Sequence, residues 1–214
     1  MQTEVHLSVP FFSNTPDNYH CFQAALRIVL AYYLPDREYN WQELDEITAH
    51  TADYTWPLAG LLHCVESGLK VENIEPFDYQ RFMIEGYSYL EELLGREVAD
   101  IQKAHSNLEQ ERKLAAEFVQ KVDVEKRVPL IEDIQSALME RRLVICNINA
   151  RVFQQLAGYT GHFVVVIGGN TDGIWLHDPG LPPVKDRFTS WGEFDRAWSY
   201  PDENARNIMA IYRP

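Results

Sequence analysis

A cysteine stands where a loop rich in turn-forming residues becomes a long apolar segment, and this junction constrains the fold more than any other part of the chain. The loop residues Thr15-Pro16-Asp17-Asn18 suit a turn and a helix N-cap, and Cys21 comes shortly after them. From Phe22 to Tyr33 only Gln23 and Arg27 are polar. The sequence therefore predicts a helix that starts near the cysteine and is buried on most of its sides.

The position of Cys21 has a chemical consequence. A thiol at the start of a helix feels the positive end of the helix dipole, which favours the nucleophilic thiolate form. Cys64 and Cys146 instead lie within apolar helical and strand-like patterns, so we expect both to be buried and unreactive. An odd number of cysteines without CxxC spacing is typical of a reducing compartment and gives no metal-knuckle pattern.

Composition sets limits on the class of protein. A chain of 214 residues with 46% hydrophobic residues can form one substantial core. The formal net charge of -13 argues against a nucleic-acid binder or a binder of anionic membranes, because both need a basic surface. The chain opens without a basic and apolar leader, and its longest apolar run, around Leu26 to Leu34, is too short to span a bilayer. We therefore expect a cytoplasmic protein without a membrane span.

The first part of the chain is mainly helical. Residues 5–12 alternate loosely and indicate a short strand, which Pro10 keeps at the edge of a sheet. After the buried helix, a second helix is expected to begin near Asn40, and a third is expected from Leu58 to Glu66. Residues 69–74 then alternate like a strand at an exposed edge of a sheet.

Residues 78–128 differ from the rest in being strongly charged. Between Val98 and Val122 apolar residues recur at helical spacing, while the remaining positions are mostly charged or polar. The simplest interpretation is a solvated helical insertion packed on the core. The alternative is a lid over the functional site or an arm for dimerisation, so the oligomeric state stays open.

The last part of the chain is rich in strands. The expected elements are a helix over 130–139 and strands over 143–149, 163–169, 173–178 and 209–212. Two of these strands are joined by Asn170-Thr171-Asp172, which is a strong hairpin signal. Helices that precede an antiparallel sheet indicate the α+β class. We expect residues 1–214 to form a single domain.

The hairpin brings two polar residues together. His162 begins one arm, and Asp178 ends the other. A three-residue loop pairs Gly169 with Gly173 and His162 with Gly180, which makes Asp178 a diagonal neighbour of His162 on the same face. With a loop of two or four residues, Asp178 and His162 would lie on opposite faces of the hairpin unless a bulge intervenes.

Cys21, His162 and Asp178 are the three groups that thiol-based catalysis requires. Cys21 would attack as a thiolate, His162 would stabilise that thiolate and protonate the leaving group, and Asp178 would orient the imidazole. The backbone N–H of Cys21 is a natural donor for the oxyanion of a tetrahedral intermediate. The histidines show no spacing typical of metal ligands, so we expect no metal and no cofactor.

The sequences around these three residues resemble a known family. The similar segments are Val9-Pro10-Phe11-Phe12, Cys21-Phe22-Gln23-Ala24-Ala25-Leu26, Gly161-His162-Phe163-Val164-Val165-Val166-Ile167-Gly168 and Leu176-His177-Asp178-Pro179-Gly180. They are similar to the bacteriocin-processing, double-glycine-leader cysteine peptidases and their stand-alone relatives, a branch of the papain-like superfamily. The resemblance implies a papain-like fold, with an N-terminal helical half packed on a C-terminal antiparallel sheet. It also implies that Cys21 is the nucleophile, His162 the base and Asp178 the orienting residue.

The chain departs from the family pattern in two places. Phe22 follows the cysteine where the family usually has glycine, which implies a bulkier wall beside the nucleophile. The family also usually has a glutamine shortly before the cysteine as an oxyanion donor, whereas this chain has Ser13-Asn14-Thr15. Asn14 and Asn18 are the candidates for that role, because asparagine carries the same amide donor on a shorter side chain.

Together these features predict a stand-alone cysteine hydrolase that cleaves a peptide or a small amide through an acyl-enzyme. One alternative is an acyltransferase that uses the same triad, as transglutaminase-like and arylamine-acetyltransferase-like proteins do. Another is a catalytically inactive peptide-binding module, which the missing glutamine suggests. The sequence does not define the substrate, because specificity depends on the shape of the site.

Overall fold

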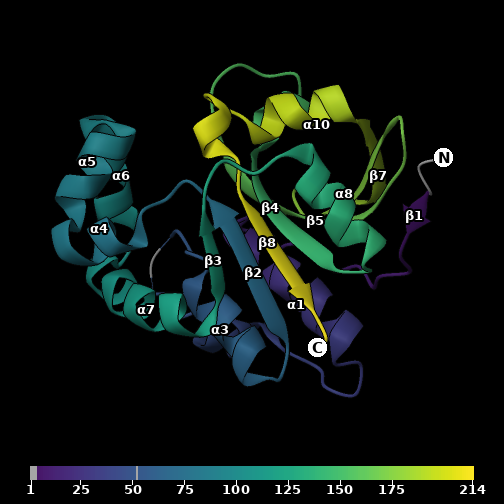
Figure 1. Ribbon diagram of the computed structural model, residues 1–214, viewed down its shortest axis with the longest axis horizontal. Coiled ribbons are helices and arrows are strands. Elements are labelled where there is room, and N and C mark those ends of the chain that lie inside the picture. Colours follow the sequence, from purple (N-terminus) through teal and green to yellow (C-terminus); the bar gives the residue numbers. More distant parts are fainter. Residues whose placement is uncertain (1–3, 52) are drawn as a thin grey trace.

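One large sheet with helices on both faces forms the protein in the computed structural model, which describes residues 4–51 and 53–214 (Figure 1). The helices are α1 (Cys21–Tyr33), α2 (Trp41–Ile47), α3 (Leu58–Glu66), α4 (Tyr79–Glu85), α5 (Tyr87–Leu94), α6 (Arg96–His105), α7 (Leu108–Lys121), α8 (Ile131–Met139), α9 (Ala150–Phe153) and α10 (Trp191–Trp198). The strands are β1 (Val5–His6), β2 (Lys70–Glu75), β3 (Asp123–Lys126), β4 (Leu143–Asn149), β5 (Gly161–Gly169), β6 (Gly173–Asp178), β7 (Val184–Ser190) and β8 (Ile208–Tyr212). The predicted α+β class is confirmed.

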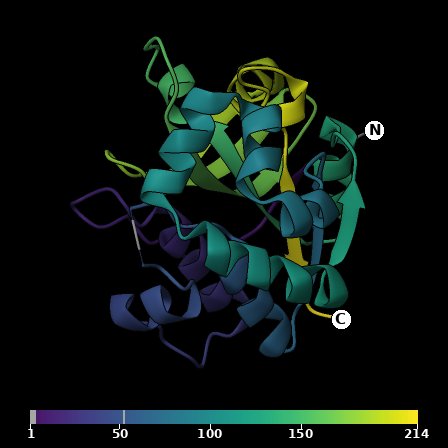
Figure 2. The ribbon, with the colours of Figure 1, turned by 90° about the vertical axis from the view of Figure 1, so that its left-hand side faces the viewer.

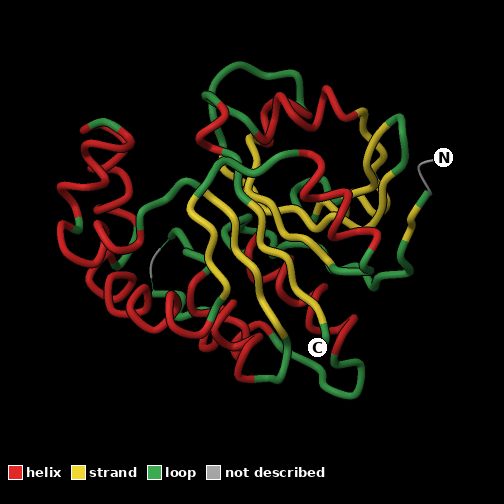
Figure 3. The backbone as a smooth tube through the Cα atoms, in the orientation of Figure 1, coloured by secondary structure: helices red, strands yellow, loops and turns green. Residues whose placement is uncertain are grey.

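The strands lie in the order β3-β2-β8-β4-β5-β6-β7, and β1 pairs with β5 beside this path. Neighbouring strands are antiparallel except β2 and β3, which are parallel. The last strand, β8, lies between β2 and β4, so it joins the earlier part of the chain to the C-terminal hairpins. Figure 3 shows the strands side by side, with helices above and below them.

Side chains alternate between two cores along the central strands. In β4, Leu143 and Ile145 pack in one core with residues of α1 and α3, whereas Val144 and Cys146 pack in another with residues of α8 and α10. This alternation follows from the two-residue repeat of a strand. Figure 1 shows α8 and α10 on the face opposite to α1. Because both faces are covered, a continuous apolar sequence is favourable here.

Helix α1 lies at the centre of the larger core, as predicted. It runs from Cys21 to Tyr33, and Leu26, Ile28 and Leu30 are fully buried within it. It ends directly before Leu34-Pro35, where proline disfavours a further helical turn. Among the described residues, neither α1 nor any other helix is long and apolar enough to cross a membrane.

The next two helices follow their local signals. Asn40 caps α2 by accepting a hydrogen bond from the Glu43 N–H at 3.0 Å, and the Glu43 carboxylate accepts from the Asn40 N–H at 2.9 Å. This reciprocal capping box satisfies two amides at the helix start. The third helix, α3, has the predicted bounds, and Cys64 is completely buried within it.

The charged segment is helical, and the apolar residues that recur between Val98 and Val122 belong to two helices. Extended backbone at Ser106 separates α6 from α7. Helices α4 to α6 gather at one edge of the molecule, and Figure 2 shows them from that side. Phe82 of α4 and Phe118 of α7 are fully buried in the core that contains α1. These aromatic side chains attach the segment to the rest of the protein.

The prediction that residues 69–74 form an exposed edge strand is wrong. The corresponding strand, β2, lies between β3 and β8. The physical reason is β3, a short strand over Asp123–Lys126 that follows α7 and pairs parallel with β2. The three charged side chains of Asp123, Glu125 and Lys126 concealed this strand, because a short charged segment gives little strand signal.

The C-terminal hairpin has the predicted register near His162, but it combines a longer loop with a bulge. At the turn, Gly169 pairs with Ile174, so the connection is longer than the three residues expected. A bulge between Val166 and Gly168 then shifts the pairing by one position, and Val165 pairs with His177. Beyond the bulge the register is therefore the one expected for a three-residue loop. His162 and Asp178 thus lie on the same face of the hairpin.

Candidate active site

Cys21 is the first residue of α1. In the described chain, His20 occupies the N-cap position and makes no side-chain hydrogen bond to the first helical turn. The thiol therefore lies at a helix terminus whose amides are not taken up by a capping side chain. Cys21 is half-buried, in contrast to the completely buried Cys64 and Cys146.

The hairpin places His162 and Asp178 in direct contact. Nε2 of His162 lies 2.8 Å from Oδ1 of Asp178, and both side chains are buried. Because Asp178 occupies Nε2, Nδ1 is the ring nitrogen left for the Cys21 thiol, whose charge also acts on His162. Next to these residues, the rings of Phe22 and Phe163 pack edge to face at 5.0 Å. This contact fixes the start of α1 against β5.

The electrostatics of the three groups favour an ion pair. Burial alone would raise the pKa of Cys21, but the hydrogen bond and charge of His162, with the amides of Phe163 and Phe22, lower it overall. Burial opposes the charged form of His162, yet Asp178 and Cys21 raise its pKa to about 9. Burial likewise opposes ionisation of Asp178, but His162 and the Gly180 N–H lower its pKa. These shifts act in the direction of a thiolate beside an imidazolium and a carboxylate.

Two residues around Asp178 were not recognised in the sequence. The Gly180 N–H donates to Oδ1 of Asp178 at 3.0 Å, and Nε of Arg187 lies 3.2 Å from Oδ2. A Cβ atom on Gly180 would lie 3.0 Å from both Oδ1 of Asp178 and Nε2 of His162. Glycine therefore lets the backbone cover this hydrogen bond closely, and a side chain here would have to displace Asp178 or His162 slightly. Arg187 could not be found from the sequence because β7, which carries it, has a weak strand pattern.

The two oxyanion candidates have different environments. Asn14 is buried, and its Oδ1 accepts hydrogen bonds from the N–H groups of Thr15 at 2.8 Å and His20 at 3.0 Å. Its Nδ2 donates to Oδ1 of Asn18 at 3.0 Å, which leaves one Nδ2 proton without a partner among the described residues. Asn18 is exposed and adopts a left-handed φ of 67°. Asn14 is thus held next to the residue before Cys21, while Asn18 orients Asn14.

Tyr54 and Tyr159 are two exposed aromatic residues that pack against other rings. Tyr159 is 55% exposed, and its pKa is raised by partial burial and, to a smaller extent, by the charges of Cys21 and Tyr54. The ring of Tyr159 stacks on that of Tyr200 at 5.8 Å. Tyr54 packs against His105 of α6, with ring centroids 5.2 Å apart. The helical segment therefore contacts Tyr54 through His105.

His177, the residue before Asp178, packs on the side of the strand that faces away from the site. It is fully buried, its Nε2 lies 3.1 Å from the Val9 carbonyl oxygen, and its Nδ1 accepts from the Asp186 N–H at 3.3 Å. Burial lowers the pKa of His177, which keeps the ring neutral. Its neighbours are thus structural groups, as expected for a strand position that points away from Asp178.

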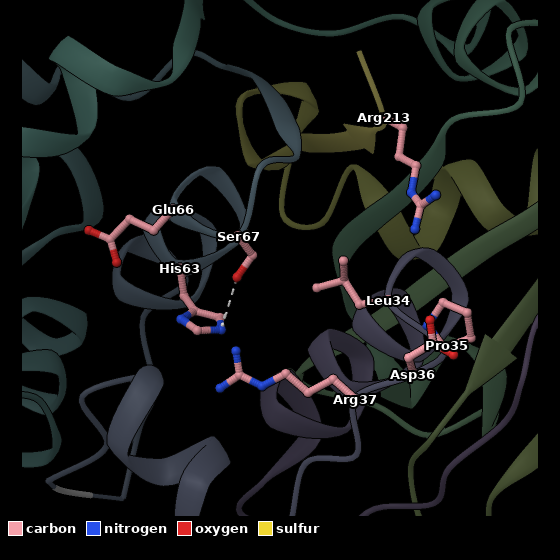
Figure 4. Close-up of a pocket in the computed structure, with 8 residues that line it drawn as sticks. All are labelled: Leu34, Pro35, Asp36, Arg37, His63, Glu66, Ser67 and Arg213. Carbon is pink, nitrogen blue, oxygen red and sulfur yellow. Dashed lines mark hydrogen bonds between the residues drawn. The ribbon is translucent and has the colours of Figure 1, made fainter.

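A surface hollow of about 460 Å³ lies elsewhere, around Leu34, Arg37 and His63 (Figure 4). Leu34 follows the last residue of α1, whereas Cys21 is the first. At 1.5 Å per residue the two ends are about 20 Å apart. This hollow therefore does not belong to the Cys21 site.

Solved structures of peptidase domains have the same fold. The peptidase domain of Streptococcus ComA, a bi-functional ABC transporter involved in quorum sensing, is 12% identical, with a TM-score of 0.51 over 98% of this chain and 100% of that one. A double glycine motif protease from an AMS/PCAT transporter, solved in complex with the leader peptide, is 14% identical, with a TM-score of 0.52 over 100% of both chains. No protein-family model and no curated protein sequence matches this chain.

These comparisons define the fold. Two protease domains that belong to transporters share the arrangement of helices and sheet over essentially the full length of this chain. At such low identity the similarity concerns architecture, and the architecture is that of these protease domains. The resemblance inferred from the sequence is thus confirmed for the fold.

Proposed function

We propose that the protein is a cysteine hydrolase, a peptidase or amidase, with Cys21 as nucleophile, His162 as general acid and base, and Asp178 as the orienting carboxylate. The observation that carries the proposal is the arrangement of the three side chains: the thiol at a helix start, the imidazole beside it, and the carboxylate 2.8 Å from the far ring nitrogen. A nucleophile, a base and an orienting group in contact are the constellation of covalent acyl transfer.

In the first half of the reaction, Sγ of the Cys21 thiolate attacks the carbonyl carbon of the scissile amide. A C–S bond forms, and the carbonyl π electrons move to oxygen. When the tetrahedral intermediate collapses, the C–N bond breaks and Nδ1 of His162 gives its proton to the leaving amine. Asp178 holds the Nε2–H throughout, so the ring keeps the orientation that this transfer needs.

The second half regenerates the enzyme. Neutral His162 takes a proton from water, and the resulting hydroxide attacks the thioester carbonyl. The C–S bond then breaks and releases a carboxylic acid, while Cys21 returns as a thiolate beside a protonated His162. No cofactor is needed in this cycle.

Two donors are available for the oxyanion of both intermediates. One is the backbone N–H of Cys21 in the uncapped first turn of α1. The other is the remaining Nδ2 proton of Asn14, whose amide is fixed by hydrogen bonds on both sides. Asn14 would thus replace the glutamine of related peptidases, and Asn18 would hold it in place.

The proposed substrate is a peptide or a small amide. Tyr54 and Tyr159 are exposed, and the charge of Cys21 acts on Tyr159, so we assign these rings to the surface that receives an extended chain. A relative of the same fold has been solved with a leader peptide bound. We also propose that residues 1–214 form one domain, because aromatic residues of the segment over 78–128 share the core of α1. Within this domain the segment is a helical insertion.

The proposal is tested with an electrophilic probe and a peptide library, on the unmodified protein, Cys21→Ala and the control Cys64→Ala. We expect labelling and hydrolysis in the unmodified protein and in Cys64→Ala, and neither in Cys21→Ala, with mass spectrometry locating the adduct on Cys21. Equal labelling of all three proteins would contradict the proposal. Added amine acceptors separate hydrolysis from acyl transfer, because transfer products in excess would identify a transferase.

A further inference from the structure

His20, Asp45 and His50 form a second cluster of polar side chains beside the start of α1. One nitrogen or oxygen atom from each residue lies within 4.8 Å of those from the other two. Nε2 of His20 and Oδ1 of Asp45 are 3.2 Å apart, and the rings of His20 and His50 are 4.9 Å apart. No step of the proposed hydrolysis uses these groups.

The backbone at the end of α2 brings His50 back toward Asp45. The His50 N–H donates to the Asp45 carbonyl at 2.9 Å, and the Ala49 N–H donates to the Glu46 carbonyl at 3.2 Å. Ala49 adopts a left-handed φ of 53°. This is the hydrogen-bond pattern of a Schellman motif, which usually has glycine at the left-handed position. The location of His50 therefore follows from the turn itself.

Hydrogen bonds on the far side of the His20 ring leave Nε2 able to bind a cation. Nδ1 lies 2.8 Å from Oγ1 of Thr15, and that hydroxyl donates to Oδ1 of Asp17 at 2.7 Å. The Thr15 oxygen therefore accepts the proton on Nδ1, and the lone pair of Nε2 faces Asp45. Metal-binding histidines are oriented in this way, by a polar partner on the second ring nitrogen.

The same pattern occurs at His50. Its Nδ1 lies 2.7 Å from Oγ1 of Thr55, which accepts a hydrogen bond from Nε2 of Gln23 at 3.0 Å. The second lone pair of this hydroxyl oxygen can accept the Nδ1 proton of His50, and in that tautomer Nε2 carries the free lone pair. Gln23 belongs to α1, so the support for the cluster comes from the buried helix.

Asp45 completes the cluster with a group that lacks a partner. Its Oδ1 atom is buried and makes no hydrogen bond to any described residue, although Nε2 of His20 is nearby. A buried carboxylate oxygen without a donor is unfavourable. A cation held between the carboxylate and the two imidazoles would supply the missing interaction.

We propose that His20, Asp45 and His50 bind a divalent transition-metal ion of the zinc type. Two imidazole nitrogens and one carboxylate oxygen suit Zn²⁺, with water in the fourth position. With bond lengths of about 2.0–2.1 Å, tetrahedral ligands lie about 3.3 Å apart. The His20–Asp45 pair is already at this separation, and the other distances shorten by about 1.5 Å at most on binding, from the 4.8 Å limit.

An ion at this position joins three parts of the chain. His20 precedes α1, Asp45 lies within α2, and His50 follows α2. Because His20 is bonded directly to Cys21, the ion fixes the backbone that carries the nucleophile. The binding of the ion itself does not depend on whether Cys21 is catalytic.

The test is titration of the metal-free protein with Zn²⁺, measured by calorimetry, and with Co²⁺, measured by visible absorption. We expect one ion per chain, with a dissociation constant on the order of a micromolar or tighter. Asp45→Asn and His50→Gln should each weaken binding at least about tenfold. The Co²⁺ spectrum should show ligand-field bands without a sulfur-to-metal charge-transfer band.

The matched control is His105→Gln, because His105 also pairs with a carboxylate, that of Asp53 at 2.7 Å. It should bind Zn²⁺ like the unmodified protein, and so should Cys21→Ser. The proposal is overturned if the unmodified protein binds no stoichiometric ion, or if His105→Gln weakens binding as much as Asp45→Asn. Loss of binding in Cys21→Ser would also overturn it, because the thiol would then be a ligand. Asp45→Asn preserves the side-chain shape. If His50→Gln does not fold, Zn²⁺ binding by Asp45→Asn is therefore the measurement that tests the proposal.

Discussion

The start of α1 and the interior of α3 each hold a cysteine within the same core, yet the two thiols differ in chemistry. Cys64 is completely buried in α3, and burial raises its pKa to about 12. Cys21 is half-buried at a helix terminus beside an imidazole, and its pKa is lowered. The comparison teaches that a helix end and a cationic partner, rather than location in an apolar core, determine whether a thiol is reactive.

The two regions also differ in how they are built. Cys64 needs only the apolar surface around α3, which local sequence supplies. The surroundings of Cys21 come from three distant segments: the loop at Asn14, the start of β5 at His162, and the end of β6 at Asp178. Substitutions in these segments should make the Cys21 thiol as unreactive as that of Cys64. The expected losses of activity differ in size and are given below from the largest to the smallest.

The largest effect is expected from His162→Gln, which removes the cation and the proton donor together. The rate kcat/KM on an amide substrate should fall by roughly a thousandfold or more. His63, on the same helix as Cys64, is the matched control, and His63→Gln should leave the rate unchanged. Equal losses of activity in the two variants would contradict a specific role of His162 at Cys21.

Asp178→Ala comes next, because it removes the group that orients the imidazole. We expect a loss in kcat of roughly a thousandfold at most, with little change in KM. Asp178→Asn should retain more activity, since an amide oxygen can still accept the Nε2–H of His162. If both variants lost activity equally, charge would matter more than orientation.

A smaller loss, roughly a hundredfold in kcat, is expected for Asn14→Ala, because it removes one oxyanion donor. Asn18→Ala should cost less, since Asn18 is exposed and acts only through its hydrogen bond with Asn14. Steady-state kinetics on one substrate compares the two. A larger effect at Asn18 would assign the donor to that residue instead.

The smallest effect, roughly a tenfold loss in kcat, is expected for Gly180→Ala. The added Cβ would lie 3.0 Å from both members of the His162–Asp178 hydrogen bond and would displace one of them. Gly192→Ala in α10 is the matched control, because an added Cβ there meets no atom within 4 Å. Unchanged kinetics in Gly180→Ala would show that the pair tolerates this displacement.

The parts of the fold that depend on local patterns could be predicted from the sequence. The buried helix α1, the capping box at Asn40 and the apolar hairpin strands each carry their signal within a few residues. The strands β3 and β7 could not be predicted, because their charged side chains hide the alternation. The position of β2 inside the sheet was missed for the same reason, since it depends on β3.

The site was predictable only in its chain positions. The order of Cys21, His162 and Asp178 indicates a triad, but the bulge that sets the register and the close approach of Gly180 are tertiary features. The cluster of His20, Asp45 and His50 has no recognisable spacing, because a left-handed turn brings it together. Dimerisation through the segment over 78–128 stays a prediction.

The central claim, that His162 activates Cys21, is tested most directly by the pH dependence of Cys21 alkylation. Iodoacetamide modification would be followed by mass spectrometry from about pH 4 to about pH 10, with EDTA present, in the unmodified protein and in His162→Gln. We expect Cys21 to react as a thiolate well below the ordinary pKa of about 8.5, and to return toward that value in the variant. Cys64 should stay unreactive throughout. An ordinary pKa for Cys21 that His162→Gln does not change would contradict the account.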